Sequence, residues 1–199
     1  LCSPHNPLGI VWTPEELRRM VELCIKHRVV LFSDEIHSDL IFHGKRHTPT
    51  ASVSDEAARY VVTGISGTKT FNLAGLIHSH VVIYDKKLME TYDAYIKTVG
   101  SAEVNIMGVT ALEAAYCGGE EWFENVKALI CHNYDYMKQE FAREVPEIKI
   151  TPLEGTYLSW LDLRGCMPGD QVAEFIQKKC HLACDVGEWF SFTGHGFIR

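Results

Sequence analysis

One lysine lies in a setting that favours chemistry over a place on the surface. Lys69 belongs to the segment GTKTFNLAGL, residues 67–76, which carries no other charge. It follows the apolar run YVVTGIS, and the small hydroxylated residues Ser66 and Thr68 lie close before it. An ammonium group is costly to bury unless it is paired or used as a reactive amine. The pattern therefore favours a functional lysine over a solvated one.

Asp34 follows a second apolar run. The run VVLFS, residues 29–33, predicts a strand covered on both faces, and YVVTGIS, residues 60–66, predicts another. In an α/β sheet, ligands bind at the carboxyl ends of the strands. Because Asp34 follows the first strand and Lys69 the second, we expect both side chains to face one edge of the sheet, with a ligand between them.

The remaining elements alternate along the chain. Thr13 can cap a helix, Pro14 suits its first turn, and Glu16 completes a capping box, so a helix is predicted from here to about Arg28. The run SHVVIYD predicts a third strand at residues 79–85. Further helices are predicted at residues 86–98, 104–116, 120–144 and 169–179.

Two domains follow from this order. Buried strands alternating with helices predict an α/β first half with a mostly parallel sheet, spanning residues 1–118. After the long helix, the strand-like segments 147–151 and 155–163 indicate a smaller α+β domain within residues 119–199. Neither end of the chain has the polar character of a frayed terminus, so we expect an interior segment of a longer protein.

The composition excludes several classes of protein. The chain has 199 residues, 46% of them hydrophobic and 23% charged, which is typical of a globular protein. Its net charge of −7 argues against a nucleic-acid surface, and no run of about 18 apolar residues predicts a membrane span. The seven cysteines are scattered without a C-x-x-C pair, which predicts reduced thiols and a cytoplasmic protein.

Four segments together resemble a known family. They are SPHNPLG with Asn6, SDEIHSDL with Asp34 and His37, SGTKTFNLAGL with Lys69, and the final GFIR with Arg199. The combination resembles the fold-type I pyridoxal-phosphate enzymes of the aminotransferase class I/II family. Within that family it is most similar to the C–S β-lyases of the MalY/PatB cystathionine β-lyase type. The resemblance covers the whole chain, which would be the C-terminal half to two-thirds of such an enzyme.

The resemblance implies roles around pyridoxal 5′-phosphate. Lys69 would hold the cofactor as a Schiff base and act as the catalytic base that removes the substrate's Cα proton. Asp34 would keep the ring nitrogen protonated, which makes the ring an electron sink. Asn6 and His37 would hydrogen-bond the ring's 3-oxygen.

Other roles concern the phosphate and the substrate. The resemblance implies that Ser66 and Thr68 donate hydroxyl hydrogen bonds to the cofactor phosphate. Arg199, with Asn6, would bind the α-carboxylate of a small amino-acid substrate. One position departs from the pattern, since many aminotransferases have a phosphate-binding arginine eight residues after the lysine, where this chain has Ile77.

Ordinary structural interpretations stay open for several of these residues. Asp34 could be a turn or capping residue, and His37 a satisfied core histidine. Glu35 and Asp39 have no assigned role and are interpreted as a solvated or structural pair. Residues 187–192, GEWFSF, could line the mouth of the pocket or form a plain turn.

Metal binding is not predicted. His43 and His47, and likewise His78 and His80, have a spacing seen in metal sites. No cysteine or carboxylate pattern completes either pair, so we expect no metal ion.

The leading functional hypothesis is a C–S β-lyase that cleaves cystathionine or cysteine-type substrates to pyruvate, ammonia and a thiol. An aminotransferase using the same residues is the close alternative. A second alternative is an aminotransferase-like sensor domain of a transcriptional regulator. The resemblance also implies a homodimer, while the net charge and the lack of a long apolar run predict no nucleic-acid or membrane partner. Because part of the site would lie upstream of Leu1, we expect the isolated segment to be inactive.

Overall fold

The computed structural model describes residues 1–100 and 103–199, and its N-terminal part begins with a capped helix. Helix α1, Pro14–His27, has the predicted capping box: the Thr13 side chain accepts from the N–H of Glu16, and the Glu16 carboxylate accepts from the N–H of Thr13 at 2.8 Å. It ends at Arg28, which is left-handed with φ 54°. Its inner face buries Leu17 and Val21.

Three strands form the first sheet where three were predicted, but the first is not covered on both faces, because Phe32 is 52% exposed. They are β1 (Leu31–Asp34), β2 (Val61–Ile65) and β3 (His80–Ile83), in the order β1-β2-β3. β1 and β2 are parallel, with Leu31 opposite Val61 and Asp34 opposite Gly64, whereas β3 runs antiparallel to β2. A one-turn helix that the sequence did not predict, α2 (Ala57–Tyr60), leads directly into β2.

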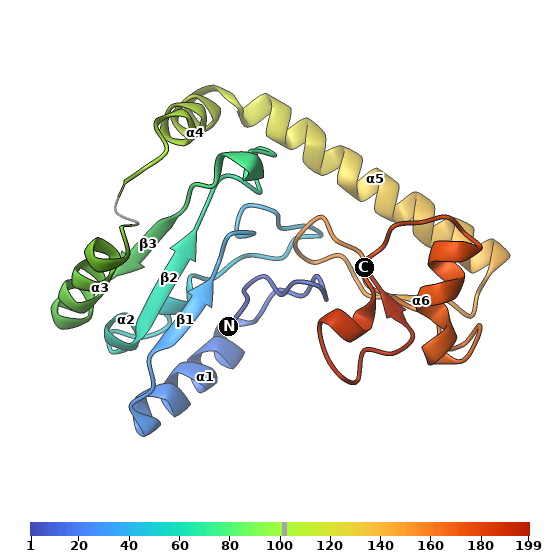
Figure 1. Cartoon of the computed structure of the whole chain (residues 1–199), viewed down its shortest axis with the longest axis horizontal. Helices are drawn as coiled ribbons and strands as arrows, with labels where there is room; N and C mark the ends of the chain where they lie inside the picture. The colour runs from blue at the N-terminus through green and yellow to red at the C-terminus, as the bar shows by residue number, and fades with distance from the viewer. Residues whose placement is uncertain (101–102) are drawn as a thin grey trace.

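Three further helices carry the chain away from this sheet. They are α3 (Lys86–Val99), α4 (Ile106–Gly118) and α5 (Glu120–Glu144), close to the predicted ranges. In Figure 1, α5 runs from the region of α4 to the second sheet. A cluster of buried side chains joins α5 to both halves of the chain, with Leu40 and Phe42 packed against Tyr134 and Leu153. This packing fixes the second half of the chain against the segment that follows Asp34.

The C-terminal part contains a small antiparallel sheet and one helix. Its elements are β4 (Lys149–Ile150), β5 (Leu161–Asp162), α6 (Gly169–Lys178) and β6 (Phe197–Ile198), with sheet order β4-β5-β6. Three short 3₁₀ helices complete the chain: η1 (Thr50–Ser52), η2 (Ala74–Leu76) and η3 (Gly187–Trp189).

The long strand expected at residues 155–163 is wrong for most of its length. Only Leu161–Asp162 pairs in the sheet. The backbone of residues 155 and 156 is hydrogen-bonded to the first half of the chain instead. The N–H of Gly155 donates to the carbonyl of Gly9 at 2.8 Å, and the N–H of Thr156 donates to the carbonyl of Leu40 at 2.9 Å. A Cβ atom at Gly155 would lie 2.7 Å from Pro4, so this close contact requires glycine.

None of the helices in the described ranges combines the length and the apolar character needed to cross a lipid bilayer. The proposed domain boundary between residues 118 and 119 stays a prediction, and residues 101 and 102, which fall inside the first predicted domain, lie outside the described residues. For function, the important result is that the ends of β1 and β2, the start of the chain and Arg199 converge.

Candidate active site

The parallel pairing of β1 and β2 brings Asp34 and the Lys69 loop to one edge of the sheet, as expected. Asp34 is the last residue of β1 and lies opposite Gly64, while β2 ends one residue later. The first residues of the chain hold the end of β1 in place: the Asp34 N–H donates to Leu1, and its carbonyl accepts from Ser3, both at 2.9 Å. One carboxylate oxygen of Asp34 accepts from the N–H of Ile36 at 3.2 Å.

Lys69 is half-buried and its amine is available. The lysine ion pairs of the described residues are made by Lys45, Lys86, Lys127 and Lys178, and not by Lys69. Lys69 instead lines an open cavity of about 310 Å³ together with Leu40, Trp122 and Tyr157, among other residues. An amine that faces a cavity without a carboxylate partner can react with a carbonyl group or hold a proton.

The loop before Lys69 packs tightly and uses its own hydroxyl groups. Ser66 Oγ donates to the carbonyl of His78 at 2.6 Å, so its single proton is used. Thr68 Oγ1, 2.7 Å from Ser66 Oγ, must then be the donor between the two hydroxyls. A Cβ atom at Gly67 would lie 2.7 Å from the Tyr116 ring, so glycine allows the loop to touch α4.

A side chain that the sequence analysis left unassigned anchors the other side of this loop. Asp39 Oδ2 accepts from the hydroxyl of Thr70 at 2.8 Å and lies 3.3 Å from the Tyr116 hydroxyl. Asp39 comes from the segment after β1, Thr70 follows Lys69, and Tyr116 belongs to α4. The carboxylate therefore links the two loops that carry the candidate site.

Glu35 and Asp39 do not form the predicted pair, and Glu35 is not solvated. Glu35 is only 2% exposed and binds His47 Nε2 at 2.8 Å, the N–H of Thr50 at 2.9 Å and the hydroxyl of Ser33 at 2.9 Å. Burial raises the pKa of Glu35, but these hydrogen bonds outweigh it and leave the pKa below its usual range. Because side chains alternate along a strand, Glu35 and Ser33 point away from the face to which Asp34 points.

His37 is buried beside the charged groups of the site. It is 3% exposed, and its ring packs edge-on against Tyr157 with the centroids 5.6 Å apart. The pKa of His37 is lowered from 6.5 to about 4, mainly by burial; the positive charges of Lys69 and Arg199 contribute to the lowering, and Asp34 opposes it. Its Nδ1 atom is buried without a partner among the described residues.

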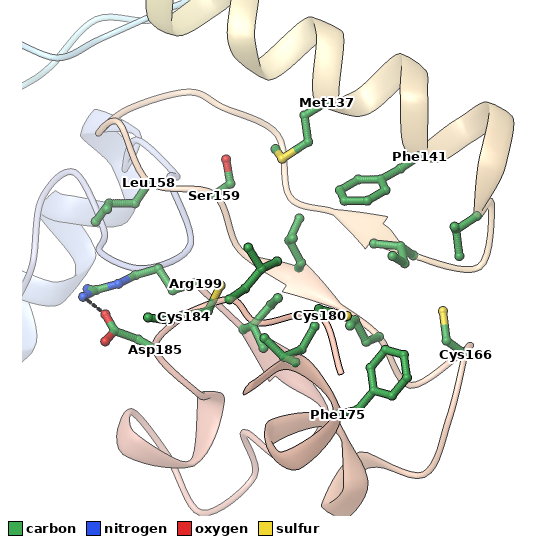
Figure 2. A pocket seen from close by; sticks show the side chains of 18 of the residues that line it. Met137, Phe141, Leu158, Ser159, Cys166, Phe175, Cys180, Cys184, Asp185 and Arg199 are labelled. Carbon is green, nitrogen blue, oxygen red and sulfur yellow. Dashed lines mark hydrogen bonds and ion pairs between the residues drawn. The ribbon is translucent and has the colours of Figure 1, made fainter. Parts of the chain in front are cut away.

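Arg199 reaches the site from the far end of the chain. Its Nη1 donates to Asn6 Oδ1 at 2.8 Å, across 193 positions of sequence. Its Nη2 pairs with Asp185, a contact visible in Figure 2, and its guanidinium carbon lies 4.8 Å from the centre of the Phe190 ring. The sequence analysis did not single out Asp185 or Tyr157, because no motif marks either residue.

The segment 187–192 contributes to a cavity beside Asn6. Gly187, Phe190 and Ser191 line this cavity of about 460 Å³ with His5, Asn6 and other residues. This cavity shares no lining residue with the cavity at Lys69, so the pocket-mouth interpretation of GEWFSF stays a prediction. A group of three or more histidine, cysteine, aspartate or glutamate side chains able to hold a metal ion does not occur in residues 1–100 and 103–199.

A larger, mostly apolar cavity lies mainly outside this site. It measures about 790 Å³ and lies between α5 and the small sheet, with Met137, Phe141 and Phe175 among its walls (Figure 2). Arg199 touches it, but Lys69 and Asp34 do not line it. Its charged wall residues are Asp185 and Arg199, which pair with each other, so we place the candidate active site at the edge that carries Lys69 and Asp34.

Comparison with known proteins identifies the class to which this fold and site belong. The sequence model described as "Aminotransferase class I and II" matches residues 1–199. The chain belongs to this family.

Two relatives and one solved structure refine the comparison. The chain is 37% identical to cystathionine beta-lyase PatB of Bacillus subtilis and 32% identical to protein MalY of Escherichia coli. Both alignments include 100% of this chain, but only 52% of PatB and 51% of MalY. Its structure matches that of cystalysin from Treponema denticola, which contains a pyridoxal 5′-phosphate cofactor, with a TM-score of 0.95, 34% identity and 50% of that chain covered. The chain thus spans about half the length of these relatives, and its fold is that of fold-type I pyridoxal-phosphate proteins.

The ring-binding part of the site fits this cofactor. The free amine of Lys69 and the buried, unpartnered Nδ1 of His37 would both be satisfied by a ligand with an aldehyde and a hydrogen-bonding substituent. Asp34 adds a carboxylate suited to a protonated ring nitrogen. The phosphate contacts fit less directly, because the hydroxyl protons of Ser66 and Thr68 are used within the loop. The individual roles of these residues remain predictions.

The buried His37 predicts a pH-dependent stability. An unfolded histidine binds a proton near pH 6.5, whereas folded His37 binds one only near pH 4. The unfolded state therefore binds more protons between these values, and the stability present above pH 6.5 is lost as the pH falls towards 4. In His37→Gln, the fall in the free energy of unfolding between pH 7 and pH 4 should be smaller by about 3 kcal/mol than in the original protein. Urea unfolding of the cofactor-free proteins at the two pH values measures this difference.

His132→Gln is the matched control, since His132 is exposed on α5. This variant should keep the pH dependence of the original protein. Equal pH dependence in His37→Gln and the original protein would show that His37 is not held neutral by the fold.

Proposed function

We propose that the full-length protein is a pyridoxal-phosphate-dependent C–S β-lyase acting on cystathionine or a similar cysteine derivative. The observation that carries the proposal is the half-buried Lys69, free of an ion pair, at the same sheet edge as Asp34. The 37% identity to a cystathionine beta-lyase over the whole chain supports this choice of reaction.

Each residue of the site has a stated task in this proposal. Pyridoxal phosphate, when bound, stabilises negative charge at the substrate's Cα atom. Lys69 Nζ carries the cofactor and then takes the Cα proton. Asp34 holds a proton on the ring nitrogen, while His37 and Asn6 donate hydrogen bonds to the ring oxygen. Ser66 and Thr68 are proposed phosphate contacts, which requires the hydroxyl pair to turn outward from the Ser66–His78 bond.

Arg199 binds the α-carboxylate of the substrate in this proposal. Its position supports the role, because it donates to Asn6 and its charge lowers the pKa of His37 at the centre of the site. Fixing the carboxylate orients the Cα–H bond toward the amine of Lys69. Elimination then cleaves the Cβ–S bond, and water releases pyruvate and ammonia beside the free thiol.

Lys69 should be the residue that binds the cofactor covalently. After incubation of the full-length protein with pyridoxal phosphate and borohydride, mass spectrometry should find the reduced adduct on the peptide containing Lys69. Lys69→Ala should give no adduct at this site and lower turnover by a factor of about 10² to 10⁴, the usual contribution of a general base. The control is Lys86→Ala, because the side chain of Lys86 on α3 is 91% exposed. This variant should leave the adduct on Lys69 and the turnover unchanged. An adduct on another lysine would refute the assignment.

The reaction type can be tested directly. If the protein is a lyase, cystathionine should give pyruvate over many turnovers without an added 2-oxo acid, because elimination regenerates the original cofactor. An aminotransferase would instead convert its cofactor once and stop until a 2-oxo acid arrived. Pyruvate measured against enzyme concentration separates the two outcomes, and a single turnover that resumes with 2-oxoglutarate would favour the aminotransferase.

We also propose that the full-length protein is a cytoplasmic homodimer that binds neither nucleic acid nor membranes. Seven free thiols support a reducing compartment. The exposed apolar residues Ile106 and Met107 of α4, 71% and 64% exposed, support a partner surface. Sedimentation of the full-length protein at micromolar concentration should give twice the mass of one chain, and a single-chain mass would contradict the dimer.

A further inference from the structure

Arg199 is held on three sides by its own chain. Its Nη1 donates to Asn6 Oδ1, its Nη2 pairs with the carboxylate of Asp185, and the face of its guanidinium group lies against Phe190. The backbone adds a fourth contact, because the N–H of Arg199 donates to the carbonyl of Asp185 at 2.9 Å. Asp185 is therefore held beside Arg199 by a backbone hydrogen bond as well as by the ion pair.

The ion pair uses the nitrogen that a substrate carboxylate would need. A guanidinium group can bind a carboxylate by two parallel hydrogen bonds on its end, through Nη1 and Nη2, or on its side, through Nε and Nη2. Nη2 belongs to both pairs and carries one hydrogen for each, so Asp185 takes one of these two hydrogens. A substrate carboxylate that binds at the same edge must displace Asp185, and one that binds at the other edge lies beside its negative charge, so the two carboxylates repel each other either way.

The geometry allows Asp185 to give way. Its side chain is 34% exposed and that of Arg199 is 23% exposed, so water can solvate the aspartate after it leaves. Its backbone is held by the bond to Arg199 and by the bridge between Val186 and Ile198, so only the side chain has to rotate. The contact is consequently an exchangeable ion pair and not a buried one.

We propose that Asp185 is a specificity-determining residue that competes with the substrate's α-carboxylate for Arg199 and so weakens the binding of amino-acid substrates. The inference rests on the proposed role of Arg199 as the carboxylate-binding residue. In this inference Asp185 lowers the affinity for the substrate. A residue that only oriented Arg199 would raise that affinity instead.

The test uses the full-length, cofactor-loaded protein and glycine, an amino acid with no leaving group at Cβ. Asp185→Asn keeps the shape of the side chain and removes its charge. We expect the Kd for glycine, measured by calorimetry, to fall about three- to fivefold, as for the loss of a partly exposed ion pair. The KM for cystathionine should fall with it while kcat stays unchanged. Glu188→Gln is the matched control, because Glu188 lies in the same segment but pairs with His195 at 2.9 Å, and it should change neither constant.

The arginine variant separates this inference from the proposed function. In an Arg199→Ala background glycine should bind weakly, and adding Asp185→Asn should then have no effect. If Arg199→Ala weakens binding but Asp185→Asn raises the Kd or leaves it unchanged, the competition is refuted while the role of Arg199 stands. If Arg199→Ala leaves glycine binding unchanged, both are refuted. If circular dichroism shows that Asp185→Asn does not fold, Asp185→Ser is used in its place. The same change in the Kd for glycine is expected.

Discussion

The parallel pairing of β1 with β2 is the constraint on which the candidate site depends. Strands paired in parallel end at the same edge, so the register that sets Asp34 opposite Gly64 also sets the Lys69 loop beside the carboxylate. A shift of one residue would turn Asp34 to the other face and bring Glu35 in its place. The buried contacts of Glu35 with His47 and Thr50 oppose that shift, because it would break them.

Charge balance at the site follows from this arrangement. Lys69 and Arg199 bring positive charge near His37, and Asp34 brings negative charge. Burial adds to the positive neighbours and keeps the imidazole neutral at physiological pH, so His37 can donate and accept a hydrogen bond without carrying a charge. Asp39 meanwhile ties the loop after β1 to the residue that follows Lys69. The site is thus positioned by polar contacts and tuned by burial.

The second half of the chain contributes through packing. Tyr134 on α5 and Leu153 pack against Leu40 and Phe42, close behind the site, and the backbone of residues 155 and 156 bonds to residues 9 and 40. This packing explains why a stretch that looks like a long strand in sequence pairs over only two residues. It also brings Tyr157 against His37 and carries β6, with Arg199 directly after it, up to Asn6.

Local chemistry is what the sequence determined by itself. The capping box at Thr13, the three apolar strands and the helix at residues 120–144 depend on neighbours along the chain, and the structure confirms them. The shared edge of Asp34 and Lys69 followed from the general geometry of α/β sheets. Only the tertiary structure decided which partners meet across long stretches of sequence: Glu35 with His47, Asp39 with Tyr116, and Arg199 with both Asn6 and Asp185. Such contacts depend on how separate elements pack, and no periodicity or motif along the chain records that packing.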